Sequence, residues 1–449
     1  MILITALALT FACSSQQGLP SDSAVRAVLV PRVAAFPDSG KHGTGIVIGL
    51  LDASGTRRIV AVGVDSSRVF EIGSITKVFT TSVLEDMVER GEVRLDDPVA
   101  KFLPPSVRMP ARSGRQITLL DLATQSSGLP RMPSNFTPRD SMNPYADYTE
   151  QQMYTFLSGY ELTRDVGAEY EYSNLGVGLL GHALALKAGT SYEDLVRRRI
   201  LAPLGMRETA ITLTPALRAK IAPGHDAEGR VVPNWDLPTL AGAGALRSTA
   251  ADMLRFLAAN IDSTATPLSR TFRQTHGERH ATDNPSMKVG LGWHILARPV
   301  GKIVWHNGGT GGYRSYLGFD PARRIGVVVL SNVDDGVDDI GIHLLDETFP
   351  VRPPPKRRTE VAVDSLVLNR YVGEYEVAPA FHVVVTREAA RLFVQATGQQ
   401  RFPVFGESDS TFFLKVVDAQ IRFERDTTGA VRGLVLHQDG QVIPGRKIR

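Results

Sequence analysis

The chain has 449 residues, of which 43% are hydrophobic and 22% charged, and its formal net charge is +3. This composition is typical of a soluble globular protein, and the near balance of charge without a dense Lys/Arg stripe argues against nucleic-acid binding. The length corresponds to about three domain-sized units, or to one large core with an appendage. Cys13 is the only cysteine, which excludes an intramolecular disulfide.

The N-terminus carries an apolar run from Ile2 to Ala12, followed by Cys13 and polar residues. The run is too short to span a bilayer but suits the hydrophobic part of a secretory signal peptide. We therefore expect residues 1–20 to be a signal and the protein to be exported, either to the periplasm or outside the cell. The run also resembles a bacterial lipoprotein signal, which would lipidate Cys13 as a membrane anchor, although no Lys or Arg precedes it and Thr10 stands where leucine is usual. The alternative is a buried first strand or helix.

The first half of the chain predicts a hairpin followed by a mainly helical region. After a helix-like stretch over residues 24–35, two strands at 45–51 and 58–64 form an antiparallel hairpin. From about residue 91 to 238 strand signals are sparse, and helices broken by Pro and Gly dominate. We interpret this region as a helical insertion in a sheet-based core. Its helix-like segments are 118–125, 150–157, 176–188 and 192–200.

Sheet signals return after the insertion. Thr249 is the expected N-cap of a helix, and a meander of strands follows it. The first hairpin and this meander together predict one antiparallel sheet with helices on its faces, an α+β fold of the α/β-sandwich type. The expected elements are a helix over 249–259, strands over 290–297, 302–306, 313–319 and 324–331, and a helix over 337–349.

The composition changes at Val351-Arg352-Pro353-Pro354-Pro355, which is typical of a linker. We expect a large domain over residues 21–350, a linker over 351–365 and a small all-β barrel or sandwich over 366–449. The all-β prediction rests on short segments in which apolar and polar residues alternate and which turn residues separate. These segments are 381–386, 391–395, 411–416, 420–424 and 433–437.

The segment from Glu71 to Lys77 predicts the start of a buried helix that carries a reactive serine. Ser74 and Lys77 are one helical turn apart and therefore lie on the same face, within reach of each other. At the first turn, free backbone N–H groups favour developing negative charge on Ser74. A desolvated lysine can take the proton of a neighbouring hydroxyl and make it a nucleophile. The alternative is a helix cap with a solvated Lys77.

Two further motifs add candidate catalytic residues to the Ser74–Lys77 pair. Tyr172-Ser173-Asn174 lies in the helical insertion, and His306-Asn307-Gly308-Gly309 lies at the end of a strand. Each motif alone is weak, but their order and context are much more specific. With them the chain resembles the serine β-lactamase and penicillin-binding-protein superfamily, in the branch of class C β-lactamases, D,D-peptidases and related esterases. The resemblance covers about residues 28–349. It rests on Phe70 to Lys77, Leu95 to Val99, Ile117 to Pro130, Tyr172 to Gly178, Leu201 to Met206, Ala241 to Asp252 and Trp305 to Gly312.

The resemblance implies a helical subdomain beside an antiparallel sheet, with the active site in the cleft between them. It implies that Ser74 attacks the substrate carbonyl and becomes acylated, and that Lys77 and Tyr172 handle protons, with the principal base left open. Asn174 would hold Lys77 and a substrate amide. Backbone N–H groups of Ser74 and Gly309 would form the oxyanion hole.

The strand that ends in His306-Asn307-Gly308-Gly309 would bind the substrate through Asn307 and Gly308, because its glycines allow a substrate backbone to approach closely. The chain departs from the family pattern where many members have Lys-Thr-Gly and this sequence has His306-Asn307-Gly308. A permanent cation is thereby replaced by a group that we expect to titrate near neutral pH, with a catalytic, electrostatic role for His306. The alternative is a histidine at the end of a strand whose hydrogen bonds are satisfied within the fold and which has no catalytic role. Gln125-Ser126 replaces the common His-Thr, and we attach no catalytic role to it.

The sequence gives weaker support to two other candidate sites, for zinc and for phosphate. His276 and His280 are four residues apart but lack the His-Glu-x-x-His order of a zinc protease. The glycines of 308–312 are not followed by the Gly-Lys-Ser/Thr helix start of a phosphate loop. We therefore expect neither a metal nor a cofactor.

The sequence thus predicts an exported serine hydrolase that acts through a Ser74 acyl-enzyme on β-lactams, D-amino-acid peptides or both. A carboxylesterase, a covalent β-lactam or peptidoglycan sensor with little turnover, and a scaffold with a vestigial site are the alternatives. The partner is a small-molecule or peptide substrate, and the oligomeric state and the role of the C-terminal domain stay open.

Overall fold

The computed structural model describes residues 18–36, 43–262, 266–299, 301–354, 358–379, 381–397, 401–415, 419–438 and 441–449. The signal-like run and Cys13 lie outside these residues. The chain divides into two compact units, residues 1–353 and 354–449. Among the described residues, no helix has both the length and the apolar character needed to cross a membrane.

The first unit is built on an eight-stranded antiparallel sheet in which the N-terminal hairpin joins the later meander. The two meet where β1 pairs with β14, with Ile46 opposite Ser331. This confirms the predicted single antiparallel sheet. In spatial order its strands are β2 (Arg57–Val62), β1 (Ile46–Leu51), β14 (Ile325–Ser331), β13 (Arg314–Asp320), β12 (Lys302–Gly309), β11 (His294–Ala297), β10 (Met287–Val289) and β9 (His280–Ala281).

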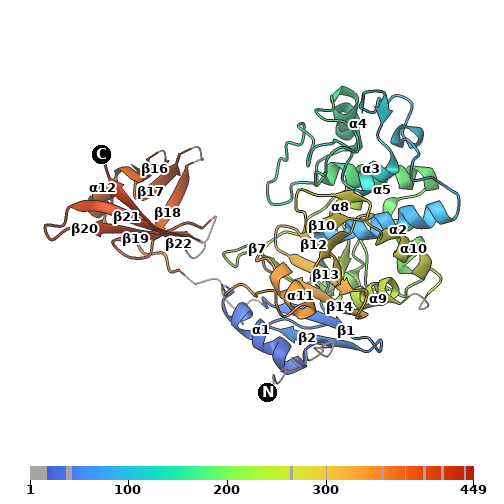
Figure 1. Ribbon diagram of the computed structural model, residues 1–449, viewed down its shortest axis with the longest axis horizontal. Coiled ribbons are helices and arrows are strands. Elements are labelled where there is room, and N and C mark those ends of the chain that lie inside the picture. The colour runs from blue at the N-terminus through green and yellow to red at the C-terminus, as the bar shows by residue number, and fades with distance from the viewer. Residues whose placement is uncertain are drawn as a thin grey trace, which may run out of the picture. The chain divides into compact units, whose positions relative to one another are not determined.

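Helices cover both faces of this sheet (Figure 1). Successive strand residues point to opposite faces, so β14 supplies Val327 and Val329 to one core and Val328 and Leu330 to the other. The first core is shared with α1 (Asp22–Ala34) and α11 (Asp338–Leu345). The second is shared with α9 (Ala250–Ile261) and with α2 (Thr76–Glu89), whose side chains are buried from Thr76 to Met87. Thr249 caps α9 as predicted, because its hydroxyl accepts the N–H of Asp252.

The region between α2 and α9 is mainly helical, as predicted. Capping boxes start two of its helices: Thr118 with Asp121 begins α3, and Thr149 with Gln152 begins α4. Its helices are η2 (Val99–Phe102), α3 (Leu119–Ala123), α4 (Glu150–Gly159), α5 (Asn174–Ala188), α6 (Tyr192–Val196), the π-helical η3 (Arg197–Leu201), α7 (Pro215–Lys220) and α8 (Ala241–Gly244). Short pairs are β3 (Phe70–Glu71) with β8 (Arg247–Ser248), β4 (Ala111–Arg112) with β5 (Arg115–Gln116), and β6 (Gly224–His225) with β7 (Val231–Val232).

Two predictions about the meander were wrong in detail. The strand expected over 290–297 begins only at His294, as β11, because residues 290–293 form the turn from β10, in which Gly292 takes a φ of +75°. The strand expected over 302–306 continues as β12 to Gly309, so the glycines belong to the sheet. The helix α10 (Ser269–Thr275) was not anticipated.

The second unit is a closed eight-stranded barrel with its own core, which confirms the all-β prediction and decides between barrel and sandwich. The part of the expected linker nearest the barrel belongs to this unit, because Val361 N–H donates to Gly406 O and Asp364 caps α12 (Ser365–Tyr371). Its strands are β15 (Gly373–Ala378), β16 (Phe381–Glu388), β17 (Arg391–Ala396), β18 (Phe402–Gly406), β19 (Thr411–Phe413), β20 (Ala419–Arg425), β21 (Val431–Gln438) and β22 (Gln441–Lys447).

Candidate active site

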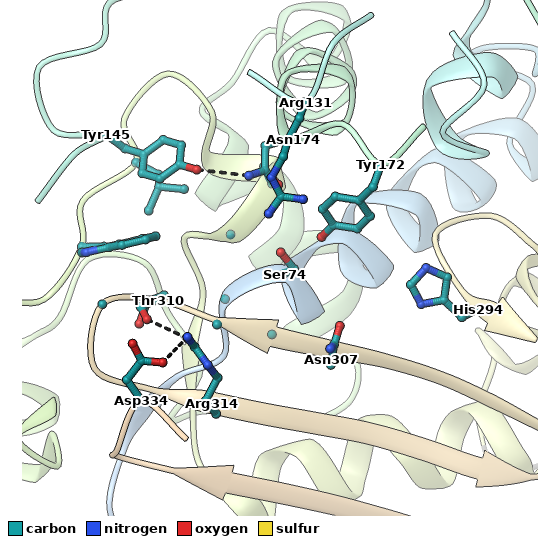
Figure 2. Close-up of a pocket in the computed structure, with 18 of the residues that line it drawn as sticks. Ser74, Arg131, Tyr145, Tyr172, Asn174, His294, Asn307, Thr310, Arg314 and Asp334 are labelled. Atoms are coloured by element: carbon teal, nitrogen blue, oxygen red, sulfur yellow. Dashed lines mark hydrogen bonds and ion pairs between the residues drawn. The ribbon is translucent and has the colours of Figure 1, made fainter. Parts of the chain in front are cut away.

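A cavity of about 640 Å³ opens where the end of β12 faces the helical region of the first unit (Figure 2). Most of the predicted site residues line this cavity or lie directly behind its wall. Its lining includes Ser74, Arg131, Tyr145, Tyr172, Asn174, Trp235, His294, Asn307, Gly308, Gly309, Thr310, Arg314 and Asp334.

Ser74 lies in the short helix η1 (Gly73–Ile75), which leads directly into α2. The first N–H groups of a helix have no partner inside it, so the Ser74 amide is available to an anion. The helix is fixed at its core by the ring of Phe79, which stacks on Phe256 of α9 with centroids 4.0 Å apart. The serine therefore sits on a rigid, buried element.

Lys77 is fully buried and its amine has three close neighbours. Nζ lies 2.9 Å from Ser74 Oγ, 2.8 Å from Asn174 Oδ1 and 2.7 Å from the carbonyl oxygen of Ala243. The two carbonyl oxygens can only accept. A neutral amine therefore gives its two N–H groups to them and directs its lone pair at the serine hydroxyl.

Burial holds the pKa of the Lys77 amine well below its usual value, and the nearby charge of Arg131 lowers the pKa further. Both effects favour the neutral amine. Lys77 is thus prepared to take the proton of Ser74.

Tyr172 lies across the cavity from the strands, and Lys77 Nζ is 4.8 Å from its ring centroid. Burial raises the pKa of the Tyr172 hydroxyl, an effect that its hydrogen bond with Ser74 only partly offsets. The phenol therefore keeps its proton at neutral pH. Asn174, the first residue of α5, is held by the hydroxyl of Tyr145, which lies 3.1 Å from its Nδ2 and so turns its Oδ1 toward Lys77.

Gln125 holds the chain on both sides of Tyr172, a role that the sequence did not reveal. Its side-chain Oε1 accepts the N–H of Ser173 at 2.7 Å, and its backbone oxygen accepts the N–H of Glu171 at 2.8 Å. Gln125 is buried and has a φ of +60°, which turns both acceptors toward this segment. Gln125 thus positions the tyrosine.

The free edge of β12 faces Ser74. Pairing with β11 stops at Trp305, and the N–H of Thr310 bonds to Tyr313 on the β13 side. Because the N–H groups of an antiparallel strand alternate in direction, the N–H of Gly309 points to the free edge. An added Cβ on Gly73 would lie 2.7 Å from Gly309 N, so the two backbones are in close contact. Gly73, which directly precedes Ser74, and Gly309 are thus close, as an oxyanion hole built from the N–H groups of Ser74 and Gly309 requires.

Asn307 and Gly308 line the cavity as expected of substrate-binding residues. Asn307 Nδ2 donates to Asp338 Oδ2 at 2.7 Å, which fixes its side chain. Gly308 has no room for a side chain, because an added Cβ would lie 2.0 Å from the carbonyl oxygen of Ile72. Glycine is therefore needed for the strand to approach the serine helix, as well as for substrate access.

His306 corrects one expectation. Its ring is buried, 1% exposed, stacked on the ring of His294 at 5.0 Å and absent from the cavity lining. Burial, with the neighbouring His294 and Lys77, holds its pKa well below the usual range. Its Nδ1–H donates to the carbonyl of Asn307 at 2.6 Å. The ring is thus a neutral packing group behind Tyr172, and the prediction that it titrates near neutral pH was wrong.

A buried ion pair supports the opposite wall of the cavity. Glu71 Oε1 accepts the N–H of Trp235 at 2.9 Å and lies 3.2 Å from Arg247 Nη2. Burial raises the pKa of Glu71, which Arg247 opposes. The ring of Trp235 lies 5.4 Å from that of Tyr145, and the two form an aromatic wall that no motif predicted.

The two histidines of the rejected zinc pattern bond elsewhere. His276 Nε2 lies 2.8 Å from Asn260 Oδ1, and His280 Nε2 lies 3.0 Å from the oxygen of Gly167. Within the described part of the chain, no cluster of three or more His, Cys, Asp or Glu side chains is placed to hold a metal ion.

Comparison with known proteins gives two family matches. The model of the β-lactamase family matches residues 40–346, and that of a domain of unknown function (DUF3471) matches residues 357–447. The D-alanyl-D-alanine-carboxypeptidase/endopeptidase AmpH of Escherichia coli K12 is 31% identical over 61% of this chain and 75% of its own length. Penicillin-binding protein 4* of Bacillus subtilis strain 168 is 27% identical over 84% of this chain and 86% of its own.

Solved structures share the fold. A β-lactamase/D-alanine carboxypeptidase of Yersinia pestis, in complex with citrate, superposes with a TM-score of 0.62 at 24% identity, over 73% of this chain and 96% of that protein. A class C β-lactamase gives 0.63 at 21% identity, over 74% and 97%. These two likenesses support the architecture of the first unit.

Proposed function

Because this chain belongs to the β-lactamase family of serine hydrolases, we propose that it hydrolyses D-alanyl peptides, β-lactams or both through an acyl-enzyme on Ser74. The observation that carries the proposal is the environment of Lys77. Two obligate acceptors and one hydroxyl surround its amine, so that a neutral Lys77 has only Ser74 left to accept from.

In the acylation step, Lys77 takes the Ser74 proton as Oγ attacks the substrate carbonyl carbon. The carbonyl π electrons move to oxygen, and the N–H groups of Ser74 and Gly309 stabilise that oxyanion. The resulting ammonium of Lys77 has three donors for its three neighbours, so no hydrogen bond is lost when it is protonated.

Collapse of the tetrahedral intermediate expels the leaving group, whose nitrogen takes a proton from Tyr172. The raised pKa of Tyr172 suits this role, because the hydroxyl still carries its proton when the leaving group departs. Transfer of the Lys77 proton to the phenolate then restores both groups. In deacylation, water takes the place of the leaving group and attacks the acyl carbonyl carbon, while Tyr172 and Lys77 move its proton in the reverse direction to Ser74 Oγ. The acid product then leaves and Ser74 is free.

The names of the relatives support this substrate class. AmpH is described as a D-alanyl-D-alanine carboxypeptidase and endopeptidase, and other relatives as β-lactamases, among them that of Escherichia coli K12 at 30% identity. The Asn307 side chain and the free edge of β12 support binding of an extended peptide or its β-lactam analogue.

A carboxylesterase is the second candidate, and the neutral state of His306 favours it. The strand lacks the cation that binds a carboxylate in many family members, and simple esters need no such group. Both candidates use the same nucleophile, so substrate comparison separates them.

The test is a panel with a chromogenic cephalosporin, a D-alanyl-D-alanine peptide and a p-nitrophenyl ester, each assayed with the wild type and Ser74→Ala. We expect hydrolysis of the first two at rates that Ser74→Ala abolishes. Activity that survives Ser74→Ala would remove the nucleophile assignment. Hydrolysis of the ester alone would establish the esterase, and stoichiometric penicillin labelling without turnover would establish a sensor.

We further propose that the protein is exported, and that Cys13 is lipidated. This proposal rests on the sequence alone, since residues 1–17 lie outside the described part of the chain. Mass spectrometry of the mature N-terminus tests it, with Cys13→Ser as the control. A mature chain that retains residues 1–12 would contradict export, and a cleaved chain with an unmodified Cys13 would contradict lipidation.

A further inference from the structure

Among the residues that the structure describes, the cavity has one cation without a protein partner. Three side chains of its lining carry a full charge: Arg131, Arg314 and Asp334. His306, which stands where many relatives have a lysine, is neutral and buried behind the wall. The positive charge available to a substrate must therefore come from one of the two arginines.

Arg314 is already neutralised. Its guanidinium forms an ion pair with Asp334, and its Nη1 donates to the carbonyl oxygen of Thr310 at 2.9 Å (Figure 2). The same Nη1 donates to the carbonyl oxygen of Tyr313 at 3.1 Å. A substrate carboxylate would have to compete with Asp334 for it. Arg314 thus orders the loop after β12 and adds little net charge to the cavity.

Arg131 is different. Across the described residues its side chain has neither a hydrogen bond nor an ion pair, and it is exposed at the cavity. Its Cζ lies 5.1 Å from the ring centroid of Tyr172. Figure 2 shows the guanidinium between Asn174 and Tyr172, on the side of the cavity opposite the strands.

The backbone holds Arg131 in this place. Its carbonyl oxygen accepts the N–H groups of Asn174, at 3.0 Å, and Leu175, at 3.3 Å, at the start of α5. Contact with the Tyr172 ring takes up no N–H group in a hydrogen bond among the described residues, so the edge of the guanidinium, with its five N–H donors, stays available. Such an edge matches a carboxylate with two parallel hydrogen bonds.

We propose that Arg131 binds a carboxylate carried by the leaving group of the substrate. The inference rests on the proposed function, in which Tyr172 delivers a proton to the leaving nitrogen. A carboxylate one carbon away from that nitrogen lies beside the ring of Tyr172, where Arg131 stacks. Free C-terminal amino acids and the ring carboxylate of penicillins both have this arrangement.

Arg131 therefore takes over, from the other side of the cleft, the charge that is missing from β12. The preferred substrates are acyl donors whose leaving group is anionic, rather than neutral esters or amides. The preference for an anionic leaving group, which the Arg131 side chain provides, distinguishes a carboxypeptidase-like or β-lactam-hydrolysing enzyme from an esterase.

The test uses two esters with the same acyl group, one with D-lactate as leaving group, whose carboxylate is one carbon from the ester oxygen, and one with D-lactamide. The ratio of their kcat/KM values is measured for the wild type, Arg131→Gln and Arg131→Lys. Arg139→Gln is the matched control, because Arg139 is 92% exposed on the same loop region and does not line the cavity. Dividing each ratio by that of the control cancels the intrinsic reactivity of the two esters.

We expect Arg131→Gln to lower the carboxylate preference roughly 10- to 100-fold, the range of a hydrogen bond to a charged group, mainly through KM. Arg131→Lys should retain part of it, and added salt should weaken it in the wild type. Equal ratios in the wild type and Arg131→Gln would overturn the proposal. A loss equal for both esters would also overturn it, and would assign Arg131 to the electrostatics of Lys77 instead. Ester hydrolysis that survives Ser74→Ala marks failure of the proposed function itself, independently of these ratios.

Discussion

Lys77 Nζ lies 2.8 Å from Asn174 Oδ1, although 97 residues separate the two in the sequence. The contact joins the serine helix to the first residue of α5 and leaves the lone pair of the amine for Ser74. Tyr145 fixes the orientation of the amide from its other side. A short chain of hydrogen bonds therefore controls the direction in which the base points.

Replacing the lysine should separate its basicity from its charge. Lys77→Met removes the base and Lys77→Arg keeps a permanent cation that cannot accept a proton. We expect both to lower kcat on the order of 100- to 10,000-fold, as loss of a general base does. Thermal unfolding should show Lys77→Met folded, because methionine has a similar volume at this buried position and the lysine it replaces is neutral. Wild-type kcat in Lys77→Arg would contradict a role as base.

The pH profile should follow Lys77. Its pKa is lowered well below 10.5, and the active form is the neutral amine. Activity is therefore present above this lowered pKa and is lost as pH falls through it. Measurement of kcat/KM against pH should show one acidic limb, and Arg131→Gln should move that limb to higher pH by removing a repelling charge. A limb that moves to lower pH would contradict this assignment.

His306 should not contribute to that limb. Its pKa is held well below its usual value by burial, so the ring stays neutral on both sides of pH 7. We expect His306→Gln to change kcat through packing behind Tyr172 and to leave the shape of the pH profile near neutrality unaltered. The control is His343→Gln, on α11 and outside the cavity lining. Disappearance of a limb near neutral pH in His306→Gln would reinstate an electrostatic role for this residue.

Gln125 should matter for catalysis although it touches no substrate. Gln125→Leu leaves the buried N–H of Ser173 without its acceptor, at a cost of about 1–3 kcal/mol in stability. The segment that carries Tyr172 would shift, so kcat should fall more than KM rises. Gln151→Leu, on an exposed face of α4, is the control. If Gln125→Leu loses the expected stability but keeps a kcat close to that of the wild type, Gln125 has a structural role only.

The two glycines of β12 should respond differently to the same added methyl group. In Gly308→Ala the new Cβ would lie 2.0 Å from the carbonyl oxygen of Ile72, so β12 must move away from the serine helix. We expect kcat to fall roughly 100-fold, the cost of a displacement of this size in an active site. In Gly309→Ala the nearest atom belongs to the flexible end of Arg314, and the backbone N–H is kept. Equal effects of the two substitutions would contradict the close approach described here.

Local patterns predicted the elements of the first unit well, because burial and periodicity coincide there. The Ser74–Lys77 spacing alone placed both groups on one helical face, and the structure brings their atoms to 2.9 Å. The alternation of Val327 to Leu330 likewise reflects a sheet covered on both sides. These features depend on neighbours in sequence, which a pattern can report.

The rest depends on contacts between distant segments. The neutral state of His306 results from its burial beside His294 and Lys77, and the free guanidinium of Arg131 results from the absence of an acid opposite it within the described residues. In the barrel, the unpredicted strands β18 and β22 contain Pro403 and Pro444, which argue against strands until the closed pairing is seen.

The central claim is that Ser74 forms the acyl-enzyme, with Lys77 as its base. It is tested most directly by rapid acid quench of the enzyme with excess penicillin or ester, followed by intact mass and peptide mapping. We expect one adduct of acyl mass on the peptide that contains Ser74, which forms to full occupancy in the wild type and much more slowly in Lys77→Met. Turnover without any adduct on that peptide, or an adduct on another residue, would contradict it.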